Sequence, residues 1–365
     1  MTERKLRFYS SFVDLNQIPK DWWQSAAQDS IFLSRWWFET VIEAALDDDD
    51  EVTIGYLEHD DQPAAVLPCR VRRRSTPFGW KEYRSLTSPY SCLFHPLIAD
   101  KQNERSIARS LGEMVGRQLG TNDRLALDAF YGNWTALEDF AAGLAASGQI
   151  VECYKHFGNW YEPISGRSFA QYFRSRDGRI QEIRRRKMRL ATQIGVEFEI
   201  VSNPSSIEVG IRDYQTVYLK SWKAPEPYGN FLARLIEKSA AHGALRLGIC
   251  RLKGVPIAAQ LWTVWNRRAT IMKLAHDEKF TQLSIGTLLT AYMMNRLIEE
   301  DAVAFFDFGR GDDSYKRLWC SERNQMIGIA SARRHSLMGS AQIARRKMRN
   351  FARKLRYRPS GDLRS

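Results

Sequence analysis

The first 150 residues show hydrophobic patterns of both strand and helix type. The segment VTIGYLEHDDQPAAVLPCRVRR predicts a hairpin, because two apolar runs flank the polar turn at His59–Gln62. RWWFETVIEAAL has the spacing of an amphipathic helix, which the acidic run Asp47–Glu51 ends. Two further strands and two further helices are expected at Trp80–Leu86, Arg124–Phe130, Glu104–Leu119 and Trp134–Ser147. Such interleaving predicts an α+β fold, an α/β sandwich.

The pattern begins again near Ser165. SFAQYFRSRDGRIQEIRRRKMRLATQIG has the spacing of one helix, whose apolar face would hold Ile180, Ile183, Leu190 and Ile194. After the strand VEFEIVSN, the sequence predicts two helices around the Pro-rich loop KAPEPYGN, and LRLGICRLKGVPIAAQLWTVW predicts a second hairpin. The last unit is expected to be strand, helix and strand, at Ala269–His276, Ser284–Glu300 and Val303–Phe308.

The two halves resemble each other weakly. GYLEHDDQPAAVLP, around Pro63, is similar to ICRLKGVPIAAQLW, around Pro256, and RLALDAFYG, around Asp128, is similar to AVAFFDFGR, around Asp307. We therefore expect a duplicated domain, in which each copy is a mixed, mostly antiparallel sheet flanked by helices. The expected divisions are 1–163, 164–338 and a basic amphipathic tail at 339–365.

Composition narrows the class of protein. The chain has 365 residues, 44% of them hydrophobic, which is typical of a globular protein of two domains. The five cysteines are scattered without a C-x-x-C pair, so neither a disulfide framework nor a zinc site is expected. Neither a secretory signal nor an apolar run of roughly 20 residues is visible. These features predict a cytoplasmic protein without a metal.

The formal charge of +12 is concentrated in two places. From Arg333 to the C-terminus there are eleven Lys and Arg residues and one acid, Asp362. Nine more basic residues lie in Arg167–Arg189, against two acids. The tail at 341–359 predicts a basic amphipathic helix that could lie on an anionic membrane, touch RNA, or remain a solvated terminal helix. The run Arg184–Arg189 could bind an anion or be an ordinary solvated helix face.

The segment Arg268–Trp319 holds the candidate chemistry. Its helix opens with Ser284-Ile285-Gly286-Thr287, where free N–H groups could bind phosphate, although an ordinary capped helix start has the same residues. Neither a Walker A loop nor a kinase H-R-D loop accompanies it, and no G-x-S-x-G elbow supports a covalent nucleophile.

The string DFGRGDDSYKRLW follows the second strand of this unit. Asp307 could orient or deprotonate an amine or hydroxyl, Tyr315 could protonate a leaving thiolate or alkoxide, and Lys316 could neutralise phosphate or an oxyanion. The alternative is structural, with Asp307 capping the turn and Tyr315 packing in the core. His276 ends the preceding strand and is expected to face the same region. The remaining histidines show no metal-ligand spacing.

These residues also carry a family resemblance. LSIGTLL and FDFGRGDDSYKRLW resemble the GNAT acyltransferase superfamily, and more narrowly its branch with two tandem GNAT domains. That branch includes cellulose- and exopolysaccharide-associated acetyltransferases and is related to the Fem-type aminoacyltransferases of peptidoglycan bridges. FLSRWW, Ser221-Trp222 and VPIAAQ support the likeness, which covers roughly residues 6 to 335.

The resemblance implies an acyl-CoA co-substrate, acetyl-CoA above all, bound between the strands Ala269–His276 and Val303–Phe308. It implies direct acyl transfer to a sugar, a polysaccharide precursor or an amine, without a covalent enzyme intermediate. The implied donor-binding residues are Lys273, Leu274, Ala275, Leu283, Ser284, Ile285, Gly286, Thr287 and Leu288. The implied catalytic residues are Asp307, Tyr315, Lys316 and His276, the first three on the wall of an acceptor cleft between the copies. The superfamily loop Q/R-x-x-G-x-G/A is absent, since Gln282 is followed by Leu-Ser-Ile-Gly-Thr.

Two other functions remain open from the sequence. Fem-like relatives use aminoacyl-tRNA with a similar aromatic-Lys turn, so tRNA would be the nucleic-acid partner in that case. The chain could also be a non-catalytic accessory protein of polysaccharide biosynthesis, held at the inner face of the membrane by its tail. The first copy lacks the Tyr-Lys pair, so we expect a donor site only in the second.

Overall fold

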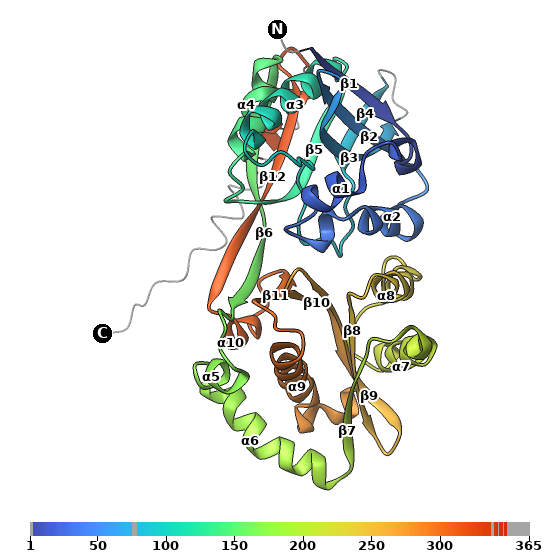
Figure 1. Cartoon of the computed structure of the whole chain (residues 1–365), viewed down its shortest axis with the longest axis vertical. Helices are drawn as coiled ribbons and strands as arrows, with labels where there is room; N and C mark the ends of the chain where they lie inside the picture. Colours follow the sequence, from blue (N-terminus) through green and yellow to red (C-terminus); the bar gives the residue numbers. More distant parts are fainter. Residues whose placement is uncertain (1–2, 75–78, 337–338, 342, 346, 349–365) are drawn as a thin grey trace, which may run out of the picture.

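A single sheet runs through the whole molecule. The computed structural model describes residues 3–74, 79–336, 339–341, 343–345 and 347–348. Figure 1 shows an elongated molecule, with the first half of the chain above the second and long strands passing between them. The α+β fold expected from the sequence is confirmed.

The first half alternates helices with strands. Its elements are, in chain order, β1 (Arg4–Tyr9), α1 (Lys20–Ala26), α2 (Arg35–Ala44), β2 (Asp50–His59), β3 (Gln62–Arg74), β4 (Trp80–Ser85), α3 (Glu104–Gln118), β5 (Arg124–Tyr131), α4 (Leu137–Ala146) and β6 (Gln149–Pro163).

The second half opens with two extra helices and then repeats the order of the first half. Its elements are α5 (Phe169–Arg174), α6 (Gly178–Gln193), β7 (Val196–Val201), α7 (Ile207–Leu219), α8 (Phe231–Ala241), β8 (Leu245–Leu252), β9 (Val255–Trp265), β10 (Arg268–His276), α9 (Ile285–Glu299), β11 (Phe305–Arg310), α10 (Lys316–Trp319) and β12 (Glu322–Arg333). Pro63 is the second residue of β3 and Pro256 the second residue of β9, so the similarity seen in the sequence falls on matching strands.

The strand order shows how the halves are joined. It is β1-β2-β3-β4-β5-β12-β6-β11-β10-β9-β8-β7, so each half occupies one end and the last strands of both halves lie in the middle. β12 pairs with β5 as well as with β6, and β6 also pairs with β11. Each half therefore completes its sheet with the last strand of the other half. The boundary at 163 and 164 falls at the end of β6, and the division into domains stays a prediction.

Hydrophobic spacing places α9 against the sheet. Its buried positions include Ile285, Leu288, Leu289, Met293 and Leu297, which recur every three or four residues as one helical face. They pack in a core with the fully buried Trp262 of β9 and Phe306 of β11. This packing fixes the N-terminus of α9 beside the end of β10.

Some sequence-based expectations for the elements are wrong. The long strands β6 and β12 and the helix α1 were not predicted. The single helix expected after Ser165 is two helices, because the Asp177 side chain accepts a hydrogen bond from Arg179 N and starts α6. Leu190 and Ile194 are exposed instead of lying on a buried face.

Most of the predicted tail at 339–365 lies outside the described residues, and its described residues, 339–341, 343–345 and 347–348, are helical. Within the described part of the chain, no helix is long and apolar enough to cross a lipid bilayer.

Candidate functional site

The strands β10 and β11 separate in the middle of the sheet. They pair in parallel at only three positions, of which Thr270–Asp307 is the last. Beyond it, the ladder between β10 and β9 carries an irregularity between Ile271 and Lys273, which leaves Met272 unpaired there. Gly309 has φ +68°, and a Cβ atom at this position would lie 3.0 Å from Ile271 O. The strands are therefore in close contact at this point and diverge after it.

A cleft of about 240 Å³ lies where the two strands separate, and we call it the splay cleft. It is lined by Pro89, Tyr90, Cys92, Lys223, Ile271, Met272, Lys273, Leu274, Phe308, Arg310, Asp313, Tyr315 and Lys316. Lys273 and Leu274, two of the predicted donor-binding residues, thus face this cleft. The third, Ala275, is buried and pairs with Ala259 of β9.

The N-terminus of α9 differs in detail from the sequence-based expectation. Ser284 has φ +53°, and its side chain makes no capping hydrogen bond, so the predicted hydroxyl cap is wrong. The first N–H groups of α9, at Ile285, Gly286 and Thr287, have no acceptor within the helix, as in any α-helix. The side chains of Ile285 and Leu288 are buried in the core, while Leu283 is partly buried against it. These residues could therefore bind a ligand through their main chain.

His276 lies beside this helix N-terminus. A Cβ atom on Gly286 would be 3.5 Å from His276 Nδ1. The imidazole ring contacts Trp222, with 4.6 Å between ring centroids, and its Nε2 is 3.4 Å from Thr281 Oγ1. Burial lowers the pKa of His276 below its ordinary value, so the ring is neutral at physiological pH. The structure places it near a helix terminus, apart from the Asp307 carboxylate.

The Tyr-Lys pair lies on the turn after β11. Lys316 is 2% exposed, and its Nζ donates hydrogen bonds to Arg310 O at 2.7 Å and Gly311 O at 3.3 Å. A further hydrogen bond to Gly309 O and an ion pair with Asp313 complete its surroundings. The Tyr315 side chain packs against Phe308, and burial raises the pKa of its phenol. Both residues line the splay cleft, where Lys316 also holds the turn together.

Asp307 faces a second cleft between the halves. This central cleft, of about 460 Å³, is lined by Asp29, Ser30, Phe32, Cys92, Leu93, His95, Lys101, Glu104, Tyr131, Asn133, Trp134, Thr135, Asn159, Tyr161, Arg268, Asp307 and Asn324. Asp307 Oδ1 accepts hydrogen bonds from Asn159 Nδ2 at 2.6 Å and from Gly309 N at 2.8 Å. Asp307 Oδ2 points toward Arg268 Nη1, 3.9 Å away.

The predicted trio is therefore divided between two clefts. Asp307 lines the central cleft, whereas Tyr315 and Lys316 line the splay cleft, so the expectation of one shared wall is wrong. The clefts meet at Cys92, which lines both. Burial raises the pKa of the Cys92 thiol to about 12, so this residue is a poor nucleophile at neutral pH.

Several residues of the site were not predicted. Arg268, Asn159 and Tyr131 surround Asp307, although they come from β10, β6 and β5. Glu226, in the loop at 220–230, forms an ion pair with Lys273 at 2.8 Å and accepts a hydrogen bond from Tyr90. A charged residue in a Pro-rich loop is an ordinary surface pattern, so the sequence contains no signal for this contact.

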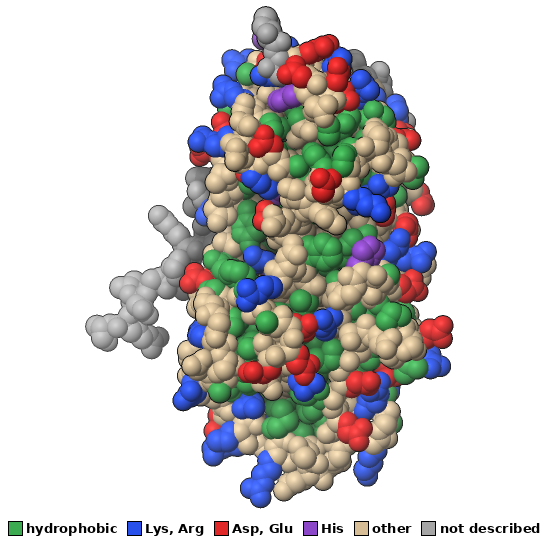
Figure 2. Space-filling model, viewed as in Figure 1, with side chains coloured by type: hydrophobic (Ala, Val, Ile, Leu, Met, Phe, Trp, Pro, Cys, Tyr) green, Lys and Arg blue, Asp and Glu red, His purple; other side chains and the backbone are tan. Residues whose placement is uncertain are grey.

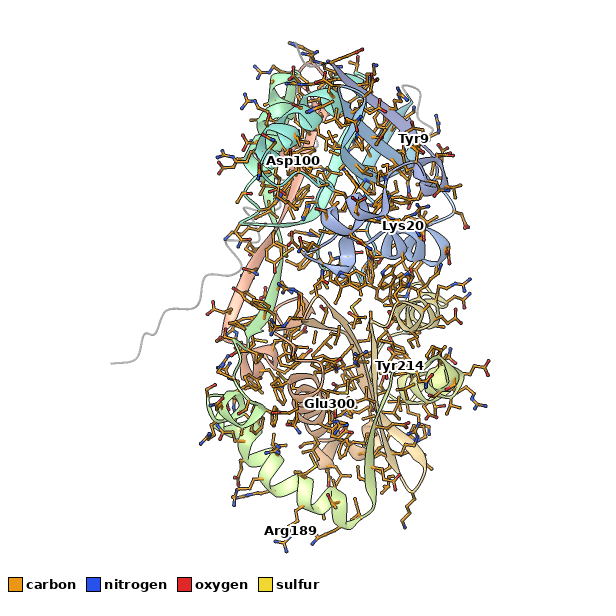
Figure 3. All side chains as sticks on the ribbon, in the orientation of Figure 1. Tyr9, Lys20, Asp100, Arg189, Tyr214 and Glu300 are labelled. Atoms are coloured by element: carbon orange, nitrogen blue, oxygen red, sulfur yellow. The ribbon has the colours of Figure 1, made fainter. Side chains whose placement is uncertain are left out.

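The basic helix α6 lies away from both clefts. Lys and Arg side chains gather around the lower end of the molecule, and Arg189 extends from it into solvent (Figures 2 and 3). Arg185 and Arg186 form ion pairs with Glu182, and Arg184 lies over the rings of Phe169 and Phe173. Much of this arginine run is thus partnered within the helix pair.

The described residues hold no cluster of three or more His, Cys, Asp and Glu side chains able to bind a metal. In the first half of the molecule, the chain's own 86–98 loop lies beside β5, at the position that corresponds to the splay cleft. Phe94 N donates to Ala129 O there, and Leu97 pairs with Val66.

Comparisons with known proteins agree on the fold. Residues 177–317 match the family model described as an acetyltransferase (GNAT) domain. FemX has a TM-score of 0.59 at 11% identity, over 86% of this chain and 96% of FemX. The C-terminal domain of a protein described as a lysylphosphatidylglycerol synthetase, from Agrobacterium fabrum, has a TM-score of 0.51 at 11% identity, over 84% and 94% of the two chains.

A conserved protein of unknown function from Bacteroides thetaiotaomicron also has a TM-score of 0.51 at 11% identity, over 90% of this chain and 100% of its own. The comparison with curated proteins found no significant match. The sheet flanked by helices is a GNAT fold, and the match to the acetyltransferase (GNAT) domain model lies within the second half of the chain. The exopolysaccharide branch of the resemblance stays a prediction.

Proposed function

We propose that this chain transfers an acyl group, acetyl in the simplest case, from acyl-CoA to a hydroxyl or amine of a saccharide or related small molecule. The observation that carries the proposal is that the pairing of β10 and β11 ends at Thr270 and Asp307 and that the strands diverge beyond Ile271 and Gly309. Separated parallel strands leave main-chain groups free to bind an extended ligand. The match of residues 177–317 to an acetyltransferase model supports the same reaction.

The residues around the splay cleft fit a CoA thioester in three respects. The free N–H groups at the start of α9 suit a pyrophosphate, because they combine hydrogen-bond donors with the positive end of the helix dipole. Gly286 leaves open space at that terminus, with His276 Nδ1 as the nearest neighbour of a Cβ atom. Ile271, Leu274 and Phe308 offer apolar contacts in the cleft. A bound acyl-CoA supplies the activated thioester.

We assign to Asp307 the role of orienting and deprotonating the acceptor. Its Oδ1 is fixed by two hydrogen bonds, so Oδ2 is held facing the central cleft. A carboxylate in this position can orient an acceptor group and take its proton. Holding donor and acceptor in adjoining clefts would supply much of the rate through proximity. Amide and aromatic side chains of the central cleft, such as Asn133, Asn324 and Trp134, suit a hydroxyl-rich acceptor.

The test uses isothermal titration calorimetry with acetyl-CoA on a matched pair of glycine variants. Gly286→Asp places a carboxylate at the start of α9, and we expect acetyl-CoA affinity to fall at least about tenfold, or about 1.4 kcal/mol. Gly178→Asp makes the same change at the start of α6, where a Cβ atom would meet nothing within 4 Å, and should leave affinity unchanged. Equal affinities in the two variants would contradict this binding site.

The wild-type titration with acetyl-CoA, together with an assay of aminoacyl-tRNA consumption, distinguishes the two candidate donors. If the wild-type chain does not bind acetyl-CoA but consumes aminoacyl-tRNA, with binding that weakens steeply as salt is raised, the aminoacyl-tRNA alternative is correct. If it uses neither donor, the non-catalytic alternative stands, and liposome flotation of the full chain against a chain ending at residue 341 tests the tail as a membrane contact.

A further inference from the structure

Arg268 lines the central cleft and carries a hydrogen-bond donor that makes no hydrogen bond to the described residues. It is the first residue of β10, and its guanidinium lies over the ring of Phe305, 5.0 Å from the centroid. The Nη1 atom is buried and has no hydrogen-bond partner among the described residues. Its distance of 3.9 Å to Asp307 Oδ2 is too long for a hydrogen bond. The contact is a long ion pair that leaves Nη1 without a hydrogen bond to the described part of the chain, and a buried donor in that state is costly, which indicates that a ligand group satisfies it.

Asp307 presents the complementary acceptor. Both hydrogen bonds recorded for its carboxylate go to Oδ1, from Asn159 and Gly309. The remaining oxygen, Oδ2, faces Arg268 across the 3.9 Å gap. One wall of the central cleft therefore carries a fixed N–H donor and a fixed carboxylate oxygen side by side.

We propose that Arg268 Nη1 and Asp307 Oδ2 together hold a hydroxyl group of the acceptor, so that the chain makes esters rather than amides. This inference rests on the proposed acyltransferase function. A hydroxyl group donates one hydrogen bond and accepts others, so it satisfies both atoms at once. An ammonium group has no lone pair and would be repelled by the Arg268 charge, and a neutral amine has only one, so an amine that accepts from Arg268 has no lone pair left to attack the thioester, whereas a hydroxyl oxygen keeps its second.

Neutral polar side chains beside this pair can bind a hydroxyl-bearing ligand. Tyr131, Tyr161 and Asn324 line the same part of the cleft and can hydrogen-bond to further hydroxyls. Burial raises the pKa of the Tyr131 phenol to about 12, so it stays neutral and remains a donor at physiological pH. The substrate class that this wall suits is a polyhydroxylated molecule such as a sugar.

The chemical step balances without a further reagent. The acceptor oxygen attacks the thioester carbonyl carbon, and its proton passes to Asp307 Oδ2. The carbon–sulfur bond then breaks, the sulfur leaves as a thiolate and takes up a proton, and Asp307 returns to its carboxylate form. The products are one ester and one thiol. Arg268 keeps the acceptor oxygen in place through its hydrogen bond.

The test uses the full chain with radiolabelled acetyl-CoA and glucosamine, which offers an amine and several hydroxyls in one molecule. Alkaline hydroxylamine cleaves oxygen esters and spares amides, so it separates the two products once unreacted acetyl-CoA has been removed. We expect the hydroxylamine-labile product to exceed the stable one at least tenfold. Arg268→Met should lower the rate of ester formation at least tenfold and leave acetyl-CoA affinity unchanged. Arg268→Lys should form the ester at a rate between those of the wild type and Arg268→Met.

The matched control is Arg267→Met, which removes the same charge from the exposed neighbouring residue that does not line the cleft. It should keep the wild-type product ratio and rate. A mainly hydroxylamine-stable product, an unchanged ester rate in Arg268→Met, or acetyl-CoA binding without either product each overturns the inference. Failure of the wild-type chain to bind acetyl-CoA overturns the proposed function instead.

Discussion

At the scale of single residues, charge and burial give Asp307 and Lys316, on β11 and the turn after it, two different roles. Asp307 keeps one carboxylate oxygen directed at the central cleft. Lys316 is different, because its ammonium is enclosed by the carbonyl oxygens of Gly309, Arg310 and Gly311. The geometry gives Lys316 a structural role in holding the turn, and its catalytic role stays a prediction.

Replacing Lys316 by methionine tests the structural role. The Lys316→Met variant leaves buried carbonyl groups without their donor, so we expect the free energy of unfolding to fall by about 2 kcal/mol. Urea denaturation followed by circular dichroism measures it. Lys20→Met, the same change at an exposed position, should stay within about 0.5 kcal/mol of the wild type. A variant at position 316 with wild-type stability but no turnover would instead support catalysis by Lys316.

At the scale of elements, the loop at 220–230 is fixed to the sheet by one carboxylate. Glu226 forms an ion pair with Lys273 of β10 and accepts a hydrogen bond from Tyr90 of the 86–98 loop. The loop follows α7, on which Tyr214 is marked in Figure 3. Burial acts to raise the pKa of Glu226, but hydrogen bonds from Lys273, Tyr218 and Tyr90 outweigh it and lower the pKa below 4.5.

This lowered pKa predicts a dependence of stability on pH. Because the folded-state pKa lies below the unfolded one, the carboxylate stabilises the fold above about pH 4.5, and this contribution is lost as the pH falls through the folded-state pKa. Glu226→Gln should therefore lower the free energy of unfolding by about 1 to 2 kcal/mol near pH 7, and the difference should shrink toward pH 3.

Melting temperatures of both proteins from pH 3 to pH 7 measure the effect. The control is Glu237→Gln on α8, where the carboxylate and its partner Arg234 are both 49% exposed, and little difference is expected at any pH. Equal melting temperatures of Glu226→Gln and the wild type from pH 3 to pH 7 would show that the contact with Lys273 is not stabilising.

At the scale of the whole molecule, the exchange of β6 and β12 makes the halves depend on each other. β12 carries Ile329, which is fully buried and lies opposite Leu127 of β5 and Cys153 of β6. A substitution in β12 therefore also disturbs the core of the first half, although β12 belongs to the second half of the chain. We expect both halves to unfold in one cooperative transition.

The Ile329→Ala variant tests this coupling. Loss of buried methyl groups should lower the free energy of unfolding by about 2 to 4 kcal/mol, and the whole transition should move together. Differential scanning calorimetry measures both. Ile194→Ala, at a position that is 36% exposed, makes the same change and should have little effect. Two separate transitions, of which only one moves, would show that the halves unfold independently.

The predictable part of the fold is the part with local causes. The hairpins β2–β3 and β8–β9 and the helices α3 and α9 follow from periodicity within each segment, and the predicted ranges lie close to the observed ones. β6 and β12 were missed because their partners lie far away in the chain, as in the pairing of Ile329 with Leu127. The polar and apolar residues of β6 and β12 follow neither the period of a helix nor the alternation of a half-buried strand.

The sequence alone determined that Asp307 belongs to a strand and that a glycine-rich turn carries Tyr315 and Lys316 after that strand, because these are properties of neighbouring residues. In the structure the strand β11 continues beyond Asp307 to Arg310. Only the tertiary structure decided which cleft each side chain faces, since the divergence of β10 and β11 directs Asp307 to one side and the turn to the other. It also decided that Arg268 and Asn159 meet Asp307. Residues far apart in the chain become neighbours only when the strands that carry them pair.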